Sequence, residues 1–312
     1  MSIQNLAADV VARDHRAIAR AISLIENESS DAAELIGYLF GHAGQASLIG
    51  VTGPPGVGKS TLVDCLTTTW RSRDRTVGVV AVDPTSPFSG GALLGDRIRM
   101  QSHADDDGVY VRSMASRGDL GGVATATSDA VVVLDAAGMD VVIVETVGVG
   151  QGQIDIARTA DVSIVVTVPG TGDDVQAIKA GIMEIADVFV VNKADATGVD
   201  RAVAEIESAL SLREYAPGTW RPPVLKTEAT SCEGVAEVVD AVERFGARHP
   251  RDGQRRQDRA RVRLREMLLR RLAERLDRDD SAQASLEEAA GQVSRGETDP
   301  YAAVTRILER LT

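Results

Sequence analysis

A run of eight residues, 53–60, has the spacing of a phosphate-binding loop: a glycine, four further residues, and then Gly-Lys-Ser. In such a loop the glycines let backbone N–H groups turn towards phosphate oxygens, the lysine places its charge near the β and γ oxygens, and the hydroxyl faces Mg²⁺. The helix expected behind the loop favours an anion at its N-terminus. We therefore predict that a nucleotide binds here, and that Lys59 also acts in catalysis. The predicted contacts are Gly53, Pro54, Pro55, Gly56, Val57, Gly58, Lys59, Ser60 and Thr61.

Acidic residues that could complete a metal site lie further along the chain. Glu145 and Asp83 each come directly after an apolar run, and Asp96 lies in a Gly-Asp-Arg sequence. Mg²⁺ at nucleotide sites keeps several waters and binds one or two carboxylates. We expect Ser60, Asp83, Asp96 and Glu145 to hold Mg²⁺, directly or through water, and Glu145 and Asp96 to act in catalysis. The alternative for either aspartate is a solvated surface residue.

A glycine-rich stretch follows Glu145, and Gly148 within it could offer its backbone N–H to a γ-phosphate. The segment 145–152 is then a candidate switch, ordered by the γ-phosphate and released after hydrolysis. Ras-type proteins carry a glutamine directly after the corresponding glycine, where it orients the attacking water. Here Val149 stands in that place and Gln151 lies two residues further. We therefore expect slow unassisted hydrolysis, with a partner or a second subunit completing the site.

The sequence Asn192-Lys193-Ala194-Asp195 follows another apolar run and predicts guanine recognition. The carboxylate of Asp195 can accept from the N1 and N2 hydrogens of guanine, which adenine does not offer, and the stem of Lys193 can stack on the base. Farther on, a backbone N–H at Ala229 could meet guanine O6. A site built to pair such groups rejects an analogue that lacks them by large factors. The predicted ligands are therefore GTP and GDP rather than ATP, and Asn192, Lys193, Asp195 and Ala229 are the predicted base-binding residues.

Short β-branched runs precede these motifs and alternate with helical segments. Near-continuous apolar strands of this kind imply an α/β fold with a mainly parallel sheet covered by helices on both faces. In such sheets ligands bind beyond the carboxyl ends of the strands, where the motifs lie. We expect three parts: an N-terminal helical extension (1–44), a P-loop G domain (45–247) and a C-terminal helical arm (248–312). The predicted strands include 48–51, 77–82, 141–144, 162–166 and 188–191.

Composition excludes several classes of partner. The chain carries a formal charge of −12 and only 3% aromatic residues, whereas nucleic-acid binders need a basic face or aromatic stacking platforms, so we expect no nucleic-acid partner. No early run of apolar residues reaches the length of a membrane span, and the N-terminus lacks the regions of a signal peptide. Cys65 and Cys232 have no Cys-x-x-Cys partner, and we interpret both as reduced, structural residues of a cytoplasmic protein without a membrane partner.

Basic residues gather in one place, since the segment 251–278 holds eleven arginines and five acidic residues. A patch of this kind could bind RNA or a membrane. Leucines recur every four residues through the same segment, at 264, 268, 272 and 276. We therefore favour a solvated helix face that pairs with the acidic body or with a second subunit.

Taken together, the motifs resemble those of the MeaB/ArgK family of P-loop GTPases, which are G-protein chaperones of adenosylcobalamin-dependent acyl-CoA mutases. The resemblance covers nearly the whole chain, and its most specific piece is Glu-Thr-Val-Gly-Val-Gly-Gln at 145–151. Arg117 departs from the small polar residues expected before the switch. The matching motifs are 53–61, Asp-Pro-Thr-Ser at 83–86, the glycine-rich segment 90–97, Leu-Gly-Gly-Val-Ala at 120–124, the segment 145–151 and Asn-Lys-Ala-Asp at 192–195.

The resemblance implies a homodimeric GTPase that binds GTP or GDP with Mg²⁺ and has its C-terminal helices at the dimer contact. It implies that the nucleotide state gates cofactor loading of a mutase of the methylmalonyl-CoA mutase type and protects or reactivates that enzyme. The segment 170–179 would be a further switch, in which Lys179 couples the nucleotide state to the mutase. Two alternatives stay open: an ATPase or kinase linked to transport of lysine, arginine or ornithine, and a nickel-insertion GTPase.

Overall fold

The computed structural model describes residues 2–84, 101–103, 105–116, 122–146, 160–170, 183–216, 218–249 and 253–311. The chain divides into two compact units, Met1–Gln257 and Asp258–Thr312. None of the helices in the described ranges is both long and apolar enough to cross a bilayer.

The described part of the first unit is built on a seven-stranded sheet in the order β3-β2-β4-β1-β5-β6-β7. All of its neighbouring strands run parallel, which confirms the predicted fold class. The central strands are fully buried because helices cover both faces, so their sequences read as continuous β-branched runs. The strands are β1 (Ser47–Thr52), β2 (Val77–Pro84), β3 (Val109–Ser116), β4 (Val141–Thr146), β5 (Val162–Thr167), β6 (Val188–Asn192) and β7 (Val224–Thr227).

The strand β3 is absent from the sequence-based prediction. Its run contains Arg112 and two serines, so it does not read as an apolar strand. It lies at an edge of the sheet beside β2, where one flank needs no strand partner. The guanidinium of Arg112 forms an ion pair with Glu26 of the N-terminal helices, which accounts for a charged residue in this strand.

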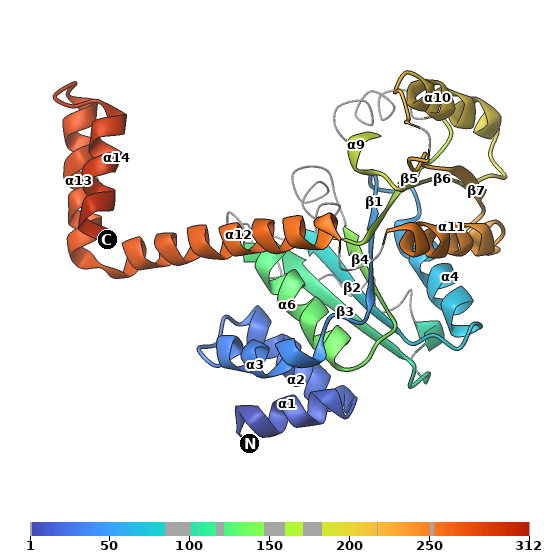
Figure 1. Ribbon diagram of the computed structural model, residues 1–312, viewed down its shortest axis with the longest axis horizontal. Coiled ribbons are helices and arrows are strands. Elements are labelled where there is room, and N and C mark those ends of the chain that lie inside the picture. Colours follow the sequence, from blue (N-terminus) through green and yellow to red (C-terminus); the bar gives the residue numbers. More distant parts are fainter. Residues whose placement is uncertain are drawn as a thin grey trace. The chain divides into compact units, whose positions relative to one another are not determined.

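Alternate residues of the strands point to opposite faces, and each face has its own core. Helices α4 (Lys59–Arg71) and α11 (Val235–Arg248) cover one face, where Trp70 and Phe245 are among the largest buried side chains. Helix α6 (Gly122–Ala136) and the N-terminal helices cover the other face beside β2 and β4 (Figure 1). Helix α10 (Val199–Ser211) packs against β5 and β6 through Ile206 and Leu210.

The N-terminal helices belong to the core of the first unit. Apolar residues at helical spacing, including Ile18, Ile22 and Leu35, are fully buried against the α6 side of the sheet. Asp14 caps the second helix by accepting from the N–H of Ala17 at 2.7 Å. The remaining short elements of this unit are α1 (Ile3–Val11), α2 (His15–Glu26), α3 (Ala32–Leu39), η1 (Phe40–His42), η2 (Gln101–His103) and α9 (Met183–Ile185).

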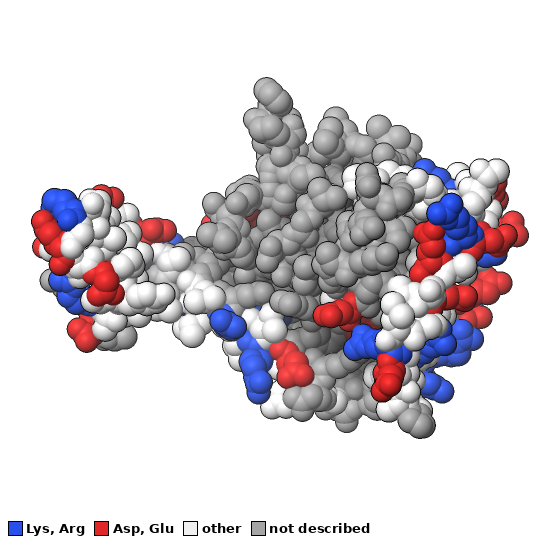
Figure 2. Space-filling view, turned by 90° about the horizontal axis from the view of Figure 1, so that it is seen from above, with Lys and Arg blue, Asp and Glu red and all other residues white. Residues whose placement is uncertain are grey.

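Helix α12 (Gln254–Arg278) leads into the second unit, where α13 (Asp280–Ser294) is followed by α14 (Pro300–Leu311). Asp299 caps α14, and Pro300 occupies its first position, as the Asp-Pro sequence predicts. The leucines of α12 are exposed, with 67% of Leu264 and 61% of Leu268 open to solvent. Figure 2 shows basic and acidic side chains interspersed on the described surface of one face, without a large patch of one sign.

Candidate nucleotide site

The predicted phosphate-binding loop connects the central strand β1 to the N-terminus of α4. Strand order reverses at β1, because β4 lies on one side of it and β5 on the other. In parallel sheets this reversal opens a crevice beyond the carboxyl ends of the strands. Helix α4 begins at Lys59, directly behind the loop, so its N-terminus faces the same crevice.

Lys59 is buried, and its ammonium donates to the carbonyl oxygens of Gly53 and Pro54, both at 2.8 Å. Burial lowers the pKa of Lys59 below its ordinary value, while the nearby charge of Glu145 acts in the opposite direction. A bound phosphate would add negative charge beside the same ammonium. The loop therefore holds a partly desolvated cation at the position where the sequence predicts one.

Ser60 and Glu145 form the second part of the site. The hydroxyl of Ser60 donates to Oε1 of Glu145 at 2.7 Å, and both residues are buried. Glu145 lies near the end of β4, where it is in register with Val51 of β1 and Ala81 of β2. A hydroxyl and a carboxylate are the hard oxygen donors that suit Mg²⁺, which keeps waters and phosphate oxygens as its other ligands. Among the residues the structure describes, no group of three or more His, Cys, Asp or Glu converges as a metal cage.

Two buried threonines support this corner, and the sequence analysis did not single them out. The hydroxyl of Thr146, directly after Glu145, lies 3.1 Å from the hydroxyl of Thr52, the last residue of β1. It also lies 3.4 Å from the carbonyl oxygen of Val51. This contact joins the ends of β1 and β4 immediately before the phosphate loop. In the sequence each of these threonines ends an apolar run, and this pattern could have identified them.

Asn192 connects the phosphate loop to the predicted base-binding loop. Its side chain is buried, and its Nδ2 donates to the carbonyl oxygen of Val57 at 2.8 Å. Its Oδ1 accepts from the hydroxyl of Thr227 at 3.1 Å and from the N–H of Ala229 at 3.0 Å. Gly58 has φ +89°, and a Cβ there would lie 2.5 Å from Nδ2 of Asn192, so glycine is required for this close approach.

The N–H of Ala229 is thus engaged with Asn192 in this structure. Its predicted contact with guanine O6 stays a prediction. Thr227 is a further residue that the sequence analysis passed over, although it stands in register with Asn192 where β6 pairs with β7. Asn192 therefore sets the distance between the two loops from within the protein.

Lys193 and Asp195 lie on the loop after β6, next to Asn192. Lys193 adopts φ +58° and donates from Nζ to the carbonyl oxygen of Gly56 at 3.1 Å, which lays its stem along the edge of the phosphate loop. Asp195 is exposed, and its carboxylate makes no hydrogen bond within the part of the chain that the structure describes. An exposed carboxylate beside the phosphate loop is free to accept from a base.

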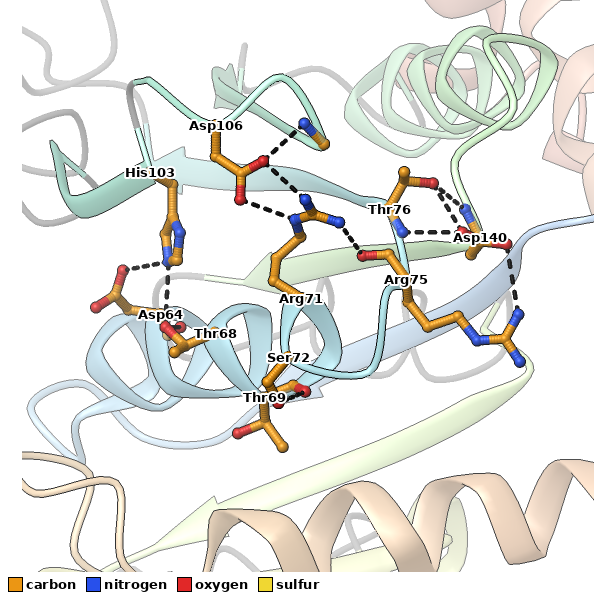
Figure 3. Close-up of polar contacts among 11 residues, drawn as sticks. Asp64, Thr68, Thr69, Arg71, Ser72, Arg75, Thr76, His103, Asp106 and Asp140 are labelled. Carbon is orange, nitrogen blue, oxygen red and sulfur yellow. Dashed lines mark hydrogen bonds and ion pairs between the residues drawn. The ribbon is translucent and has the colours of Figure 1, made fainter.

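Polar contacts on one side of α4 hold the segment that leads into β3 (Figure 3). Nε and Nη2 of Arg71 donate to the two carboxylate oxygens of Asp106 at 2.8 and 2.9 Å. That hydrogen bond is the main reason why the pKa of Asp106 lies below its ordinary value. Two turns nearer the phosphate loop, Asp64 accepts from the hydroxyl of Ser102 at 2.8 Å and lies 3.1 Å from Nε2 of His103.

A disulfide on α4 corrects one sequence-based interpretation. Cys65 and Cys232 are bonded to each other, with Cα atoms 5.5 Å apart, whereas the sequence analysis took both as reduced. Their sequence separation of 167 gave no local sign of pairing. The helix behind the phosphate loop and the loop after β7, far apart in sequence, meet at the carboxyl edge of the sheet, and this places the two sulfur atoms together.

Several predicted site residues lie outside the described residues, namely Asp96, Gly148, Gln151, Lys179 and Arg117. Asp83 is the penultimate residue of β2, but its side chain also lies outside the described part. The structure therefore brings together Lys59, Ser60 and Glu145 at the phosphate end. It brings together Asn192, Lys193 and Ala229 at the base end.

Comparison with known proteins places the chain in a family. Residues 18–281 match the model described as the methylmalonyl-CoA mutase-associated GTPase MeaB. A provisionally named GTPase of Pyrococcus abyssi is 48% identical over 303 residues, covering 96% of this chain and 93% of its own. The mouse protein named methylmalonic aciduria type A homolog, mitochondrial, is 40% identical over 200 residues, which are 63% of this chain and 48% of the mouse protein.

A solved structure supports the same placement. The crystal structure titled LAO/AO transport system kinase aligns with a TM-score of 0.74 and 26% sequence identity, covering 99% of this chain and 97% of that one. The phosphate loop, the Asn-Lys-Ala-Asp segment and the parallel sheet described above belong to the matched region. The chain belongs to the family of methylmalonyl-CoA mutase-associated GTPases known as MeaB.

Proposed function

We propose that this protein binds GTP with Mg²⁺, hydrolyses it to GDP and phosphate, and uses this cycle as a chaperone of an adenosylcobalamin-dependent acyl-CoA mutase. The observation that carries the nucleotide assignment is the buried side chain of Asn192, which spans the phosphate loop and the base-binding loop. The carboxylate of Asp195 can accept from both N1–H and N2–H of guanine, whereas N1 of adenine carries no hydrogen. Membership of a GTPase family supports the same choice of base.

Each described residue has a distinct part in this proposal. Lys59 would exchange its two carbonyl partners for oxygens of the β and γ phosphates and stabilise the charge that develops there. Ser60 and Glu145 would hold Mg²⁺, directly or through water, together with Asp83 and Asp96. When bound, Mg²⁺ supplies positive charge that neutralises the phosphate oxygens. Gly148 and Lys179 keep their expected roles as a γ-phosphate contact and as the link to the mutase.

The mutase partner and the dimer rest on the family and on the second unit. The family description names methylmalonyl-CoA mutase, and the mouse relative is named for methylmalonic aciduria. The exposed leucines of α12 form an apolar stripe on a helix that is otherwise rich in arginine. We propose that the C-terminal helices pair with those of a second copy, since pairing would remove this stripe from water.

A nucleotide titration tests the base assignment. Calorimetry with GDP and ADP is expected to show a preference for GDP of at least about a thousandfold, because adenine leaves the acceptor of Asp195 unpaired. The variant Asp195→Asn is expected to lose affinity for GDP and to gain affinity for XDP, whose O2 can accept from the new amide. Equal binding of ADP and GDP by the wild-type protein would overturn the assignment.

A kinetic experiment tests the partner. GTP hydrolysis is measured with and without a saturating adenosylcobalamin-dependent mutase, first methylmalonyl-CoA mutase and then other acyl-CoA mutases. An increase in kcat with one mutase, absent in Lys59→Ala, supports the chaperone role. No change with any of them would refute the role while leaving the GTPase assignment intact.

A kinase or ATPase serving amino-acid transport is the second candidate, because the aligned solved structure carries such a title. Competition decides between the two: displacement of bound GDP by ATP as efficient as that by GTP would favour this reading. A nickel-insertion GTPase gains nothing from the described residues, in which no cluster of metal-binding side chains converges and both cysteines are in a disulfide.

A further inference from the structure

The disulfide between Cys65 and Cys232 joins the two halves of the candidate site. Cys65 lies on α4, six residues after Lys59, and is buried, with 3% of its surface exposed. Cys232 lies in the loop between β7 and α11 and is exposed. Helix α4 carries the phosphate-binding lysine and hydroxyl, whereas that loop begins with the predicted base-binding residue Ala229. The bond therefore links phosphate binding and base binding covalently.

Hydrogen bonds within the loop between β7 and α11 connect its two ends, so a restraint at Cys232 also restricts Ala229. The N–H of Glu228 donates to the carbonyl of Glu233 at 3.0 Å, and the N–H of Ser231 donates back to the carbonyl of Glu228 at 3.2 Å. Gly234 has φ +75°, and a Cβ there would collide with the carbonyl oxygen of Lys226 in β7. The loop cannot shift at its tip without breaking contacts at its base.

On its phosphate side the loop has two attachments. One is the hydrogen bond from the N–H of Ala229 to Asn192. The other is the disulfide, whose Cys65 sulfur lies 3.2 Å from the carbonyl oxygen of Ala229. A disulfide sulfur carries no proton, so this contact is not a hydrogen bond in the oxidised protein. It shows that the covalent link sits directly against the base-binding residue.

We propose that Cys65 and Cys232 are positioning residues for the base, and that their oxidation state sets the affinity for guanine without setting the affinity for phosphate. The inference rests on the proposed guanine site. In the oxidised protein the loop is held in place before a nucleotide arrives, so less ordering is needed on binding. In the reduced protein the loop loses its covalent link and keeps its hydrogen bonds, including the one from the N–H of Ala229 to Asn192.

The chemistry is an ordinary thiol–disulfide exchange with a dithiol, small or protein-borne. One thiolate of the dithiol attacks the sulfur of exposed Cys232, the S–S bond breaks, and the sulfur of Cys65 leaves with the electron pair and takes a proton. The second thiol of the dithiol then attacks the mixed disulfide and releases Cys232. Two electrons and two protons pass to the protein, and the dithiol becomes a disulfide.

Reduction leaves the core in place. The thiol of Cys65 gains a proton that it can donate to the carbonyl of Ala229, at the 3.2 Å separation already present. The residues that lose their restraint are those at the tip of the loop, 230–233. If the disulfide had a purely structural role, its loss would lower the stability of the whole unit and would weaken the binding of every ligand equally.

The test compares the full chain in oxidised form and after treatment with dithiothreitol, with a thiol titration to establish each state. Calorimetry measures Kd for GDP and for inorganic pyrophosphate, which has no base. We expect reduction to raise the Kd for GDP about tenfold and to change the Kd for pyrophosphate by less than about twofold, because only the base loop loses its preorganisation. The double variant Cys65→Ser/Cys232→Ser should bind GDP as the reduced protein does, and dithiothreitol should not change its affinity.

A matched control is Arg73→Ala, two residues after α4, which removes ion pairs with Asp240 and Glu243 of α11 but touches no residue of the loop. It should leave both affinities and their redox response unchanged. Equal GDP affinity in both redox states overturns the inference alone. An equal loss for GDP and pyrophosphate also overturns it and assigns the bond a structural role. Absence of GDP binding in both states, with pyrophosphate still bound, overturns the guanine site and this inference together.

Discussion

Helix α4 is attached by different kinds of contact to the loop after β7 and to the segment before β3. Towards the base-binding loop it has a disulfide, and the loop itself is fixed by buried hydrogen bonds to Asn192. Towards the segment that leads into β3 it has a partly exposed ion pair from Arg71 to Asp106, and a polar contact of 3.1 Å between Asp64 and His103 (Figure 3). Buried hydrogen bonds and covalent bonds do not respond to salt, whereas exposed ion pairs do.

The difference fits the tasks proposed for the two sides. A base-binding loop gains specificity when it is preorganised, since a rigid site leaves its polar groups unpaired with the wrong base. The segment that leads into β3 follows the stretch that contains Asp96, a predicted Mg²⁺ ligand. Partly exposed charged contacts hold a segment more weakly than buried hydrogen bonds and a disulfide do, and their strength changes with salt and pH. The following variants would break or sharpen this contrast.

The largest effect is expected from Asn192→Ala. The substitution removes three hydrogen bonds and leaves the carbonyl of Val57 and the groups of Thr227 and Ala229 without their buried partner. We expect a loss of about 3–5 kcal/mol in the free energy of unfolding, from urea denaturation without nucleotide. GDP affinity should fall with it.

Lys193→Ala is the matched control, since the side chain of this exposed neighbour makes one hydrogen bond within the described ranges, to the carbonyl of Gly56. Its loss should stay below about 1 kcal/mol. If Asn192→Ala cost no more than this control, the base side would not be the rigid half of the site.

Lys59→Met should separate binding from stability. The ammonium is buried and the pKa of Lys59 is lowered by that burial, so charge at this position opposes folding in the absence of nucleotide. We expect about a thirtyfold loss of pyrophosphate affinity, equivalent to roughly 2 kcal/mol, from the missing charge-assisted contacts. Unfolding measured without ligand should show little loss. A large loss of stability would mean that the two carbonyl contacts of Lys59 are structural.

The positions of the loops 53–60 and 192–195 at the carboxyl edge of the sheet were predictable from sequence because their signals are local. The glycine spacing in 53–60 and the four residues 192–195 are short motifs, each contained in one loop. Continuous apolar runs predict buried strands. The partners of those residues were not predictable. Asn192 meets Thr227 across 35 residues of chain, and Cys65 meets Cys232 across 167, so only the finished sheet brings them together.

The contact between α4 and the segment before β3 was equally unpredictable from the sequence. Arg71 and Asp106 are both ordinary surface residue types, and nothing near either one marks it as half of a bidentate pair. Strand β3, which follows Asp106, was missed because its edge position tolerates Arg112 and serines. Local pattern therefore predicts which elements form, whereas contacts between elements depend on the order in which the strands assemble.

Asp106→Asn should weaken the charged anchor by about 1 kcal/mol, since the pair is partly exposed and screened by solvent. The hydrogen bond from Arg71 lowers the pKa of Asp106 in the folded protein. Its contribution is therefore present above the unfolded pKa and is lost as the pH falls through the lower folded value. The gap between wild-type and variant stabilities, from urea denaturation at several pH values, should begin to narrow at about pH 4 and should close only below the lowered pKa of Asp106.

High salt should also narrow the gap between wild type and Asp106→Asn at neutral pH. The control is Thr227→Val on the base side, which removes a buried hydroxyl from Oδ1 of Asn192. Its cost should change with neither salt nor acid in this range. A gap for Asp106→Asn that is insensitive to both would show that the carboxylate acts as a neutral hydrogen-bond acceptor would.

The smallest effect is expected from Arg73→Ala, in the turn that follows the C-terminus of α4. Arg73 pairs with Asp240 at 2.7 Å and Glu243 at 3.0 Å, but about half of each carboxylate side chain is exposed. Exposed pairs of this kind contribute less than about 1 kcal/mol. The helices α4 and α11 already share a buried core that includes Trp70 and Phe245, so the ion pairs add little to their alignment. A thermal melt should shift by no more than a few degrees. A larger shift would mean that exposed charge, and not the buried core beneath it, keeps α4 in place against α11, and the contrast between the two sides of the helix would lose its physical basis.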